Sequence, residues 1–389
     1  MSDSGPFAVV SRRGEDRVRA GHPWIYRSDV LEADAGSGDI VRVLGAHQRV
    51  LGEAFFSDQS QITLRMVTAG EERFGEQGWH DRIAAASRFR DSLTIDATAY
   101  RLVHGEADGL PSLIVDRYDD WLVVQALSQT TNRHLPEIVA ALVDLLSPAG
   151  ILARNDPRVR ALEGLPQEVK VLHGEVPATI AVREGLVSYE VDPRHGQKTG
   201  LFLDQRENRE AAARYAHGKV LDCFAYNGGF ALYLAPQSES VLAIDASADA
   251  VARIAANAAR NNLTHVTARE ANVFDELRYF EREGARFDTI VLDPPAFAKN
   301  KAAVEKALAG YKDINLRALR ILNPGGVLVT CSCSYNVDEP LFLQVLADAA
   351  ADARAHVTLL EKRMQGRDHP VLLTVPETYY LKCVVLRKR

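Results

Sequence analysis

The sequence predicts a multidomain protein that combines an N-terminal β-barrel, an α+β middle domain and a C-terminal α/β domain with a mostly parallel sheet. Its 389 residues exceed what a single hydrophobic core usually organises. The first third consists of short β-branched and aromatic segments, whereas strands alternate with helices from about residue 191 onward. We therefore expect domains over residues 1–70, 72–188 and 190–389.

Composition places the chain among ordinary globular proteins. It is 47% hydrophobic and 25% charged, with a formal net charge of −6, so a nucleic-acid site would have to be a local basic patch. No apolar run is long enough to cross a membrane and no secretory leader is recognisable, so we expect a cytoplasmic protein. The cysteines are too few for a disulfide framework and lack CxxC spacing, so we expect no metal site. They are Cys223, Cys331, Cys333 and Cys383.

The N-terminal third is predicted to be a small β-barrel. Its apolar segments alternate with Gly, Ser and Asp turn signals and cover residues 7–10, 40–44, 50–56 and 61–67. We expect Trp24 and Tyr26 to belong to the barrel core rather than to stack on nucleic-acid bases. The segment 71–78, rich in Glu and Gly, is predicted to be a linker.

The middle of the chain is predicted to mix helices and strands. Helices are expected over residues 79–93 and over residues 135–146, where Ser147-Pro148 closes the second one. The apolar run 113–127 is interrupted by Asp119-Asp120 and therefore predicts two strands joined by a tight turn.

Strands and helices alternate through the C-terminal part, which predicts βαβ units. The expected strands cover residues 219–224, 241–245, 266–270, 287–293 and 327–332, with two more near 356–360 and 379–386. Helices are expected at 248–261 and 301–322. In such a sheet ligands bind beyond the carboxyl ends of the strands, so the residues that follow each strand are the candidate site residues.

The first two strand ends are compatible with a nucleotide. Gly228 and Gly229 would let a ligand approach the backbone closely at the start of a helix. Asp245 ends the next strand 23 residues after Asp222, near the spacing at which an acidic side chain binds ribose hydroxyls. An ordinary strand-to-helix turn would also use glycine, so these residues alone leave the question open.

The third and fourth strand ends could hold a planar ring. Asn272 could accept a hydrogen bond from an adenine amino group, or simply cap the helix that begins there. The segment Asp293-Pro-Pro-Ala-Phe297 presents a rigid edge rich in carbonyl groups beside an aromatic side chain that can stack on a ring. A turn would explain the prolines but not the acidic residue, so we predict that this loop binds a heterocyclic base.

The fifth strand end contains a candidate nucleophile. Cys331 and Cys333 lie in the segment Thr330–Tyr335, and Cys333 is nearer the expected pocket. A buried cysteine is more often inert, so the assignment depends on the position of Cys333 beyond the strand.

A polar turn precedes the first strand of the C-terminal domain. Its side chains Gln197, Lys198, Thr199 and Arg206 are predicted to form a lid over the ligand. Asp204 lies at a predicted helix start, where an acidic cap is favourable.

Taken together, these motifs resemble one protein family. In order they are QKTGLFLDQR, LDCFAYNGGF, AID, ANVF, LDPPAF, GYKDIN, LNPGG and CSCS. The combination is similar to class I S-adenosylmethionine (SAM)-dependent rRNA methyltransferases of the bacterial large-subunit (23S) rRNA methyltransferase I type, which form 5-methylcytidine. The resemblance covers nearly the whole chain and implies a PUA-like RNA-binding domain at the N-terminus and a Rossmann-like methyltransferase fold after residue 190. The glycine loop departs from the more widespread ExGxGxG form.

The resemblance implies a SAM site and a target-base site. Asp245 would hold the ribose of SAM, Asn272 and Val273 would border its adenine, and the lid would close over the cofactor. The residues implied to contact SAM are Gln197, Thr199, Phe202, Asp204, Arg206, Phe224, Ala225, Tyr226, Asn227, Gly228, Gly229, Asp245, Ala246, Asn272, Val273 and Asp293. Cys333 would be the nucleophile. The residues implied to contact the substrate are Pro294, Pro295, Phe297 and Lys312.

The implied chemistry is methylation of cytosine C5 through a covalent adduct. Cytosine C5 is a poor nucleophile, so the Cys333 thiolate would first add to C6. Asp293 would stabilise the adduct, and either Asp293 or a water would remove the C5 proton. Lys312 would orient or neutralise a phosphate. Because the target carbon is inaccessible in a stacked helix, the base must be flipped out or single-stranded.

Large-subunit ribosomal RNA is the implied partner, and a homodimer is compatible with the sequence. Several arginines could form a basic patch for RNA unless nearby acids pair with them. They are Arg12, Arg13, Arg17, Arg19, Arg154, Arg158, Arg160 and Arg194. Two alternatives stay open: a methyltransferase that acts on an exocyclic base amine and needs no nucleophile, and a noncatalytic RNA-binding ribosome-assembly factor.

Overall fold

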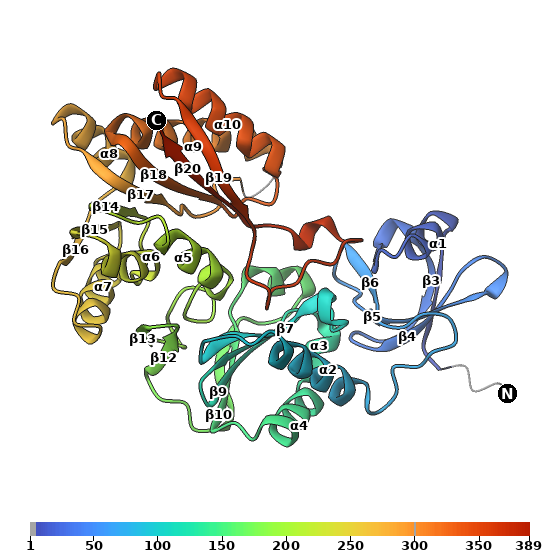
Figure 1. The fold of residues 1–389 in the computed structure, drawn as a ribbon. Coiled ribbons are helices and arrows are strands. Elements are labelled where there is room, and N and C mark those ends of the chain that lie inside the picture. Colours follow the sequence, from blue (N-terminus) through green and yellow to red (C-terminus); the bar gives the residue numbers. More distant parts are fainter. Residues whose placement is uncertain (1–4, 299–300) are drawn as a thin grey trace. The chain divides into compact units, whose positions relative to one another are not determined.

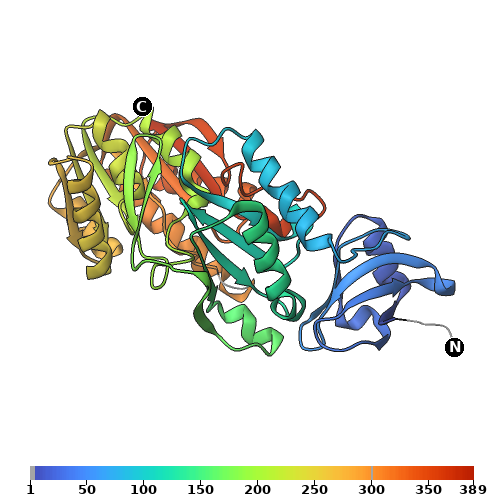
Figure 2. The same ribbon diagram turned by 90° about the horizontal axis from the view of Figure 1, so that it is seen from below.

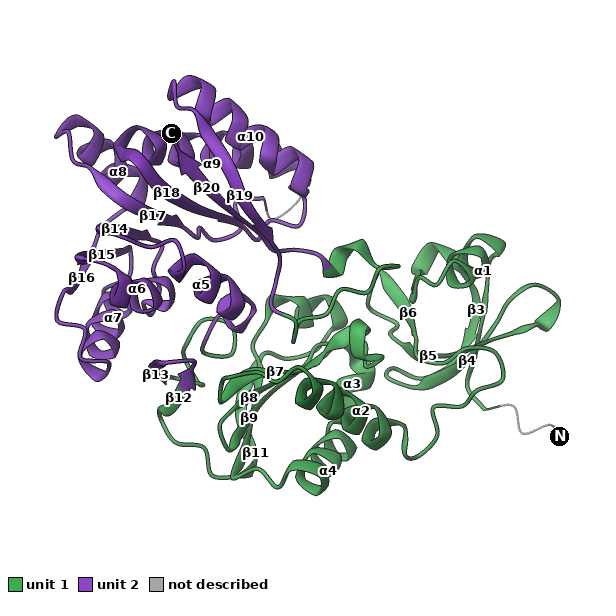
Figure 3. Cartoon of the chain, in the orientation of Figure 1, with its two compact units in different colours: residues 1–182, 191–200, 367–378 green, residues 183–190, 201–366, 379–389 purple. Residues whose placement is uncertain are grey.

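The computed structural model describes residues 5–298 and 301–389, which form two compact units (Figure 1, Figure 3). Unit 1 comprises residues 1–182, 191–200 and 367–378, and unit 2 comprises residues 183–190, 201–366 and 379–389. Each unit is therefore built from segments that are distant in the sequence. None of the described helices is long and apolar enough to span a membrane.

Unit 1 begins with a six-stranded sheet, drawn in blue in Figure 1 and Figure 2, in the order β2-β6-β5-β4-β1-β3. Its elements are β1 (Phe7–Val10), α1 (Arg12–Arg19), β2 (Trp24–Tyr26), β3 (Val30–Asp34), β4 (Ile40–Leu44), β5 (Val50–Phe56) and β6 (Ile62–Met66). The sequence predicts β1, β4, β5 and β6. Helix α1 was not predicted, because Val18 is the single apolar residue among its eight and no helical pattern results.

Strand β2 corrects the prediction for two aromatic residues. Ile25 is fully buried in the core of the sheet, whereas its neighbours Trp24 and Tyr26 are half-buried. Trp24 Nε1 donates a hydrogen bond to Glu106 Oε1 at 3.0 Å. The prediction that both aromatic residues belong to the core was wrong, because alternation along a strand places only the middle of three residues on the core face.

The second sheet of unit 1 has five strands in the order β11-β10-β9-β8-β7. Its elements are α2 (Gly78–Ser92), β7 (Ala99–His104), β8 (Leu113–Tyr118), β9 (Trp121–Ala126), α3 (Gln129–Arg133), α4 (Leu135–Leu146), β10 (Gly150–Asn155) and β11 (Glu168–Gly174). The two helices predicted from the sequence, α2 and α4, and the two predicted strands, β8 and β9, are all present. The turn between β8 and β9 uses a left-handed Asp119 with φ of 57°.

The segment 71–78 reaches helix α2 without forming a strand, as a linker would, but it is firmly packed. Phe74 is 5% exposed, and its ring centroid lies 5.5 Å from that of Phe55 and 5.0 Å from that of Trp79. Phe74 N also donates to Glu53 Oε2 at 2.7 Å. The connection between the two sheets is therefore part of the core of unit 1.

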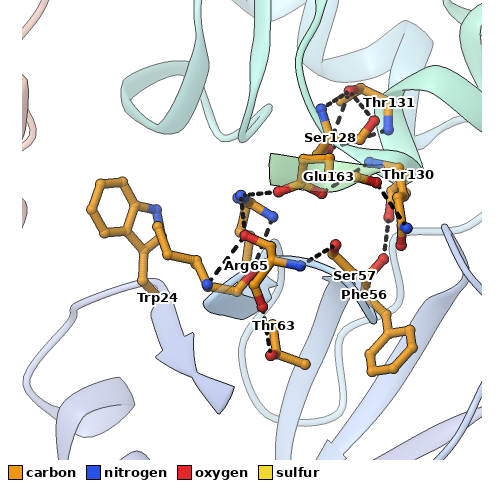
Figure 4. Close-up of polar contacts among 12 residues, drawn as sticks. Trp24, Phe56, Ser57, Thr63, Arg65, Ser128, Thr130, Thr131 and Glu163 are labelled. Carbon is orange, nitrogen blue, oxygen red and sulfur yellow. Dashed lines mark hydrogen bonds and ion pairs between the residues drawn. The ribbon is translucent and has the colours of Figure 1, made fainter. Parts of the chain in front are cut away.

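A buried ion pair joins the two sheets of unit 1 (Figure 4). Arg65 of β6 donates through Nη2 to Glu163 Oε1 at 2.8 Å. Glu163 Oε2 also accepts from Gln129 N at 3.3 Å, and Thr130 Oγ1 donates to Phe56 O at 3.2 Å. Side chains from residues 128–163 thus bind the ends of β5 and β6.

Two arginines that were expected at an RNA surface are instead buried in unit 1. Arg154 donates to Pro193 O at 2.8 Å and to Asp156 Oδ2 at 2.9 Å. Arg160 is fully buried and donates to Pro166 O at 2.9 Å. The prediction was wrong for both residues, because a buried guanidinium must be bound by the protein itself.

Other arginines of the predicted patch lie on the surface. Arg13 pairs with Asp29 at 2.6 Å, and Arg19 pairs with Glu15 at 2.5 Å. Nearby acids therefore neutralise part of the patch, as the alternative interpretation of these residues expected. Among the remaining candidates, two side chains are exposed: Arg12 and Arg158.

Unit 2 is built on a seven-stranded sheet in the order β16-β15-β14-β17-β18-β20-β19. Its strands are β14 (Lys219–Cys223), β15 (Ser240–Asp245), β16 (Val266–Glu270), β17 (Phe287–Leu292), β18 (Leu322–Ser332), β19 (Val357–Arg363) and β20 (Lys382–Lys388). The first five strands are parallel, and β20 is antiparallel to both β18 and β19. This mostly parallel sheet confirms the predicted α/β class. A separate two-stranded sheet is formed by β12 (Ile180–Glu184) and β13 (Val187–Val191).

Helices cover both faces of the large sheet (Figure 1). They are α5 (Arg206–Ala213), α6 (Gly229–Leu234), α7 (Ala248–Arg260), α8 (Val273–Arg282), α9 (Val304–Ile321) and α10 (Glu339–Asp352). Adjacent residues of β14 show why two helical layers are needed, since Val220 packs with α5–α7 and Leu221 packs with α8–α10. A strand buried on both faces has the continuous apolar run that the sequence shows.

Two strands of unit 2 start three or more residues away from the predicted position. Strand β18 begins at Leu322, five residues earlier than expected, because the β17–β18 register shifts between Phe287 and Thr289 and accommodates the extra residues. Strand β20 begins at Lys382 rather than near Tyr379, because a 3-10 turn at Pro376–Thr378 precedes it.

Candidate active site

The strand order of unit 2 indicates where a ligand binds. The order of connection reverses between β14 and β17, and ligands of open α/β sheets bind beyond the carboxyl ends of the strands at such a reversal. Residues 224–228 follow β14, residues 293–297 follow β17, and residues 333–335 follow β18. We call this region of unit 2 the carboxyl edge.

The loop after β14 has an unusual backbone. Phe224 (φ 63°) and Tyr226 (φ 52°) lie in the left-handed region that non-glycine residues rarely adopt, and Gly228 follows with φ of 86°. Such conformations persist only where the surrounding structure holds them, and they cluster at ligand sites. Here Ala225 N donates to Ile244 O at 3.0 Å, which attaches the loop to β15.

Asp222 is a buried carboxylate of β14 that sequence analysis did not single out as a site residue. Its Oδ2 accepts from Ala231 N at 2.8 Å, whereas its Oδ1 has no hydrogen-bond partner in the described part of the chain. Burial raises the pKa of Asp222 to about 8; the Ala231 hydrogen bond opposes this, and the charges of Asp293 and Asp245 add to it. In the sequence, the feature that could have indicated Asp222 is its acidic side chain within an otherwise apolar strand.

Asp245, at the end of β15, contacts the same loop. Its Oδ2 accepts from Tyr226 N at 2.9 Å, and its Oδ1 accepts from Ser247 N at 3.0 Å. Each carboxylate oxygen has a second lone pair, so the side chain can still accept hydrogen bonds from a ligand. The backbone thus orients the carboxylate that was predicted to bind ribose.

Asp293 follows β17 and is oriented by Gln205, the residue that precedes helix α5. Its Oδ1 accepts from Gln205 Nε2 at 2.8 Å, and Gln205 Oε1 accepts in turn from Asn208 Nδ2 at 2.7 Å. Sequence analysis missed Gln205 as the partner of Asp293, because 88 residues separate the two positions. This pair connects the loop after β17 to the start of α5.

Cys333 lies just beyond β18, as predicted. Its Sγ is 3.8 Å from Pro294 O, in the loop after β17. Cys333 is half-buried, whereas the other three cysteines are buried. The candidate nucleophile and the candidate base-binding loop are therefore adjacent.

Hydroxyl groups hold the backbone on both sides of Cys333. The hydroxyl of Tyr311, in α9, lies 3.0 Å from Ser332 Oγ and 2.9 Å from Ser334 Oγ. Ser334 Oγ also accepts from Ala298 N at 3.1 Å. Contacts to a helix and to a neighbouring loop thus determine the position of the candidate nucleophile.

Cys331 has the features of an inert thiol. It is fully buried in β18 and lies directly opposite Cys383 of β20. Burial, together with the neighbouring Cys383 thiol, raises the pKa of Cys331 well above that of a free cysteine. Burial likewise raises the pKa of Cys223. Neither residue is suited to act as a thiolate nucleophile.

Phe297 packs within an aromatic group at the carboxyl edge. Its ring centroid lies 4.7 Å from that of Tyr311, 5.9 Å from that of Phe274 and 6.5 Å from that of Phe224. The side chain is half-buried, so part of its surface remains accessible. Its stacking on a substrate ring stays a prediction.

Two other candidates have partners within the fold. Asn272 Oδ1 accepts from Phe274 N at 2.9 Å, so this residue does cap helix α8, as one of its two interpretations expected. Lys312 Nζ lies 2.8 Å from Asp352 Oδ2 at the end of α10, and this hydrogen bond raises the pKa of Lys312. No hydrogen bond or ion pair described for Lys312 joins it to the residues of the carboxyl edge.

The predicted lid is divided between the units. Gln197 and Thr199 belong to unit 1. There Thr199 Oγ1 donates to Asp116 Oδ2 at 2.6 Å and lies 2.9 Å from the Tyr118 hydroxyl. Buried polar contacts therefore anchor this end of the segment within unit 1.

Three further residues of the lid segment 197–206 that were predicted to contact SAM, Phe202, Asp204 and Arg206, belong to unit 2. The Phe202 ring packs edge-on against the Tyr226 ring at 5.2 Å, which connects it to the loop after β14. Asp204 lies within the 3-10 turn Leu203–Gln205 rather than at a cap position, and its Oδ2 accepts from the Tyr380 hydroxyl at 2.7 Å. The prediction that Asp204 caps a helix was therefore wrong.

Comparison with known proteins identifies the family. A family model described as an S-adenosylmethionine-dependent methyltransferase matches residues 100–373, more than half of the chain. The chain belongs to this family of SAM-dependent methyltransferases. A second model, for a PUA-like domain, matches residues 9–69 of the methyltransferase.

Relatives match the methyltransferase over nearly its whole length. A protein of Shewanella frigidimarina named ribosomal RNA large subunit methyltransferase I is 42% identical, and the match covers 94% of this chain and 95% of the relative. A protein of the same name from Vibrio cholerae is 39% identical, with 97% and 99% covered.

Solved structures share the fold of this methyltransferase. A protein of Streptococcus mutans described as a SAM-dependent methyltransferase has a TM-score of 0.82 at 20% identity, with 97% of this chain and 99% of that chain covered. A structure described as a methyltransferase in complex with SAH has a TM-score of 0.84 at 22% identity, with the same shares covered. At these identities the likeness concerns the fold.

The carboxyl edge of this methyltransferase suits SAM chemically. When bound, SAM supplies an electrophilic methyl group on a positively charged sulfur. The charges of Asp245 and Asp293 lie close enough to Asp222 to raise its pKa, so three acidic side chains gather at this edge. Asp222 Oδ1, which has no hydrogen-bond partner among the described residues, adds a buried polar atom, and a bound cation would lower the pKa of this carboxyl.

Proposed function

We propose that this methyltransferase forms 5-methylcytidine in large-subunit ribosomal RNA through a covalent Cys333 adduct. The names of its relatives support the RNA class, and the PUA-like domain supports RNA binding. The observation that carries the C5 assignment is the position of Cys333 Sγ, 3.8 Å from Pro294 O in the loop after β17. A methyltransferase that acts on a base amine requires no nucleophile at this position.

In the proposed reaction the Cys333 thiolate adds to cytosine C6, and the electron pair of the C5–C6 double bond makes C5 nucleophilic. C5 then takes the methyl group from SAM, whose sulfur keeps the electron pair of the broken bond. A base removes the C5 proton, the double bond forms again, and the thiolate leaves. The net change is one methyl group gained by the cytosine and one proton released.

Within this scheme Asp293 is the proposed stabiliser of the ring. Because Gln205 holds Oδ1 of this carboxylate at 2.8 Å, the side chain is already oriented before the base arrives. Asp293 or a water is the proposed acceptor of the C5 proton. Pro294, Pro295 and Phe297 are the proposed contacts of the base, and Lys312 is the proposed contact of a phosphate.

The individual SAM contacts belong to the same proposal. The loop 224–229 would hold the methionine portion, Asp245 the ribose, and Asn272 with Val273 the adenine, and Ala246 is a further proposed SAM contact. The lid residues named above would cover the cofactor. A cytoplasmic location, a homodimer and the three domain boundaries stay predictions.

Nucleoside mass spectrometry tests the reaction. Protein-free large-subunit rRNA is incubated with labelled SAM and with wild type, Cys333→Ala or Cys331→Ala. Cys331 is a matched control, because it lies two residues earlier in the same strand end and is fully buried. We expect labelled 5-methylcytidine from wild type and from Cys331→Ala, and none from Cys333→Ala.

Two other outcomes would replace the proposal. A label on a base amine that survives Cys333→Ala would assign the enzyme to amine methylation. If wild type transfers no label to free rRNA or to ribosomal particles, a noncatalytic RNA-binding role in ribosome assembly becomes the better account.

A further inference from the structure

Lys382 is a buried cation beside Cys333 that the proposed reaction does not yet use. It is 2% exposed, and its position at the start of β20 places it opposite Ser332 of β18. Its Nζ donates to Ser334 O at 2.8 Å and to Tyr380 O at 2.9 Å. Because Ser332 and Ser334 flank Cys333, Lys382 binds the backbone next to the nucleophile.

A lysine is an unfavourable residue at such a position unless its charge has a use. Burial of an ammonium group costs free energy, and an ammonium has three N–H donors, whereas two carbonyl oxygens accept from Lys382. Among the residues that the structure describes, no carboxylate accepts a hydrogen bond from its Nζ. The backbone ladder between β18 and β20 already holds the strands together.

Charged and titratable groups approach this position from several elements. They are Asp338 and Glu339 at the start of α10, Cys333 after β18, and Tyr311 of α9, which interacts with Cys333. Asp338 Oδ1 accepts from Leu341 N at 2.9 Å and caps α10. Glu339 pairs with Lys362 and accepts from the Tyr379 hydroxyl at 2.8 Å. Both carboxylates therefore have partners of their own.

The interaction between Lys382 and Cys333 is mutual. Burial lowers the pKa of Lys382 to about 8, and the charge of an ionised Cys333 opposes this decrease. A thiolate that favours the ammonium form of the lysine is favoured by that ammonium to the same extent. At pH 7 the lysine is still mostly protonated, so its charge is present where the nucleophile must ionise.

We propose that Lys382 is a positioning residue that holds Cys333 in its thiolate form, by binding the Ser334 carbonyl and by supplying a positive charge. This inference rests on the proposed function, in which the Cys333 thiolate is the nucleophile. The thiol proton passes to solvent, and the ammonium stays protonated. No further reactant is required.

Strand β20 contains a matched control for this lysine. Lys388, six residues further along the same strand, donates to Leu319 O at 2.7 Å and to Leu322 O at 2.6 Å. Burial lowers its pKa as well, but the charge that acts on it is that of Arg286. The two lysines therefore bind carbonyl groups in the same way, and Lys382 alone interacts with the nucleophile.

The test is the pH dependence of Cys333 alkylation by iodoacetamide in the full chain, followed by peptide mass spectrometry. Lys382→Met and Lys382→Gln should raise the apparent pKa of the Cys333 thiol by about one unit and slow alkylation at pH 7 about tenfold. Lys382→Arg and Lys388→Gln should leave the profile close to that of wild type. Glutamine can still donate to a carbonyl, so it separates the charge from the hydrogen bond.

A wild-type profile in Lys382→Gln overturns the inference, because hydrogen bonding would then account for the lysine. If the neutral variants do not fold, the ultraviolet absorbance of the thiolate is titrated in wild type and corrected with Cys333→Ala. A thiol pKa below about 8.5, the ordinary cysteine value, is expected. A value at or above it overturns the inference.

Alkylation requires neither RNA nor SAM, so the two proposals fail in distinguishable ways. If Cys333→Ala still forms 5-methylcytidine, the proposed function is wrong even when the thiol responds to Lys382. If Cys333 is essential for methylation but its alkylation is independent of Lys382, the inference about Lys382 alone is wrong.

Discussion

Buried ionisable side chains occur in two regions of this methyltransferase, and their hydrogen-bonding atoms are satisfied to different degrees. Between the sheets of unit 1, Arg65 and Glu163 lie 2.8 Å apart, with 8% and 1% of their side chains exposed (Figure 4). Both carboxylate oxygens of Glu163 have partners, since Gln129 N donates to the second one. At the carboxyl edge of unit 2, by contrast, Asp222 keeps one oxygen without a partner among the described residues.

This difference separates a structural from a functional use of buried charge. A buried ion pair whose members are fully hydrogen-bonded is expensive to break, because removal of one member leaves the other charged and unpaired. A buried carboxylate with an unused oxygen already bears an unfavourable free energy, which a ligand of opposite charge can reduce. We therefore expect substitutions at the Arg65–Glu163 ion pair of unit 1 to be strongly destabilising. We expect the stability of the carboxyl edge of unit 2 to depend on pH and on bound ligands.

Loss of the ion pair between Arg65 and Glu163 should have the largest effect on stability. Glu163→Ala leaves the Arg65 guanidinium buried without its counter-charge, which should lower the free energy of unfolding by about 3–5 kcal/mol. Urea unfolding followed by tryptophan fluorescence measures this, since every tryptophan of the chain belongs to unit 1. They are Trp24, Trp79 and Trp121.

An exposed ion pair of the same unit provides the control. Lys170 and Glu168 lie 2.9 Å apart, with 50% and 32% of their side chains exposed. Lys170→Ala should change the free energy of unfolding by about 0–1 kcal/mol. Equal urea midpoints of unfolding for Glu163→Ala and Lys170→Ala would contradict the structural role assigned to the buried pair.

The pH dependence that Asp222 gives to the free energy of unfolding should be the next largest effect. Its pKa in the folded state, about 8, lies above its ordinary value near 4. Between these values the folded state binds more protons than the unfolded state, so stability falls as pH rises, by at most about 1.4 kcal/mol per pH unit. Asp222→Asn can accept from Ala231 N but cannot ionise, so it should abolish this slope.

Hydrogen exchange of the β14 amides in SAM-free protein, corrected for intrinsic exchange rates, measures the slope. Asp288→Asn is a useful comparison, because a hydrogen bond from Lys219 N lowers the pKa of Asp288 instead of raising it. An unchanged slope in Asp222→Asn would contradict the burial of a protonatable carboxyl at the edge.

The smallest expected effect concerns the hydroxyl group of Tyr311. Tyr311→Phe keeps the ring in its packing but removes the partner of Ser332 and Ser334, so unfolding of unit 2 should become easier by about 1 kcal/mol. Far-UV circular dichroism during urea unfolding measures the change. Tyr279, which is 44% exposed, is the control, and Tyr279→Phe should have no effect. Similar decreases in the free energy of unfolding of both variants would contradict a stabilising role of the Tyr311 hydroxyl beside Cys333.

Much of unit 2 could be predicted because its strands are buried on both faces. Strand β16, at Val266–Glu270, has the predicted bounds, and β14, β15 and β17 differ from prediction by one residue. Strand β11 was not predicted, since several of its side chains, including Val169 and Val171, are exposed and its pattern carries little information about burial.

The candidate site could be predicted in part for the same reason. Asp245, Asp293 and Cys333 follow buried strands, and parallel strands place their carboxyl ends at one edge. The sequence did not indicate Asp222, Gln205 and Lys382 as site residues, because their place in the site depends on tertiary contacts rather than on a motif. Arg154 and Arg160 were misassigned because a charged residue looks the same in a sequence whether it is buried or exposed.

By itself the sequence determined the order of strands and helices in unit 2, and with it the edge at which the polar residues gather, because apolar periodicity reports which faces of a strand are buried. Only the tertiary structure decided which charges have partners. The groups that decide this are far apart in the chain: 48 residues separate Ser334 from Lys382, 88 separate Gln205 from Asp293, and 98 separate Arg65 from Glu163. The cost of a buried charge depends on these distant partners, and no local pattern contains them.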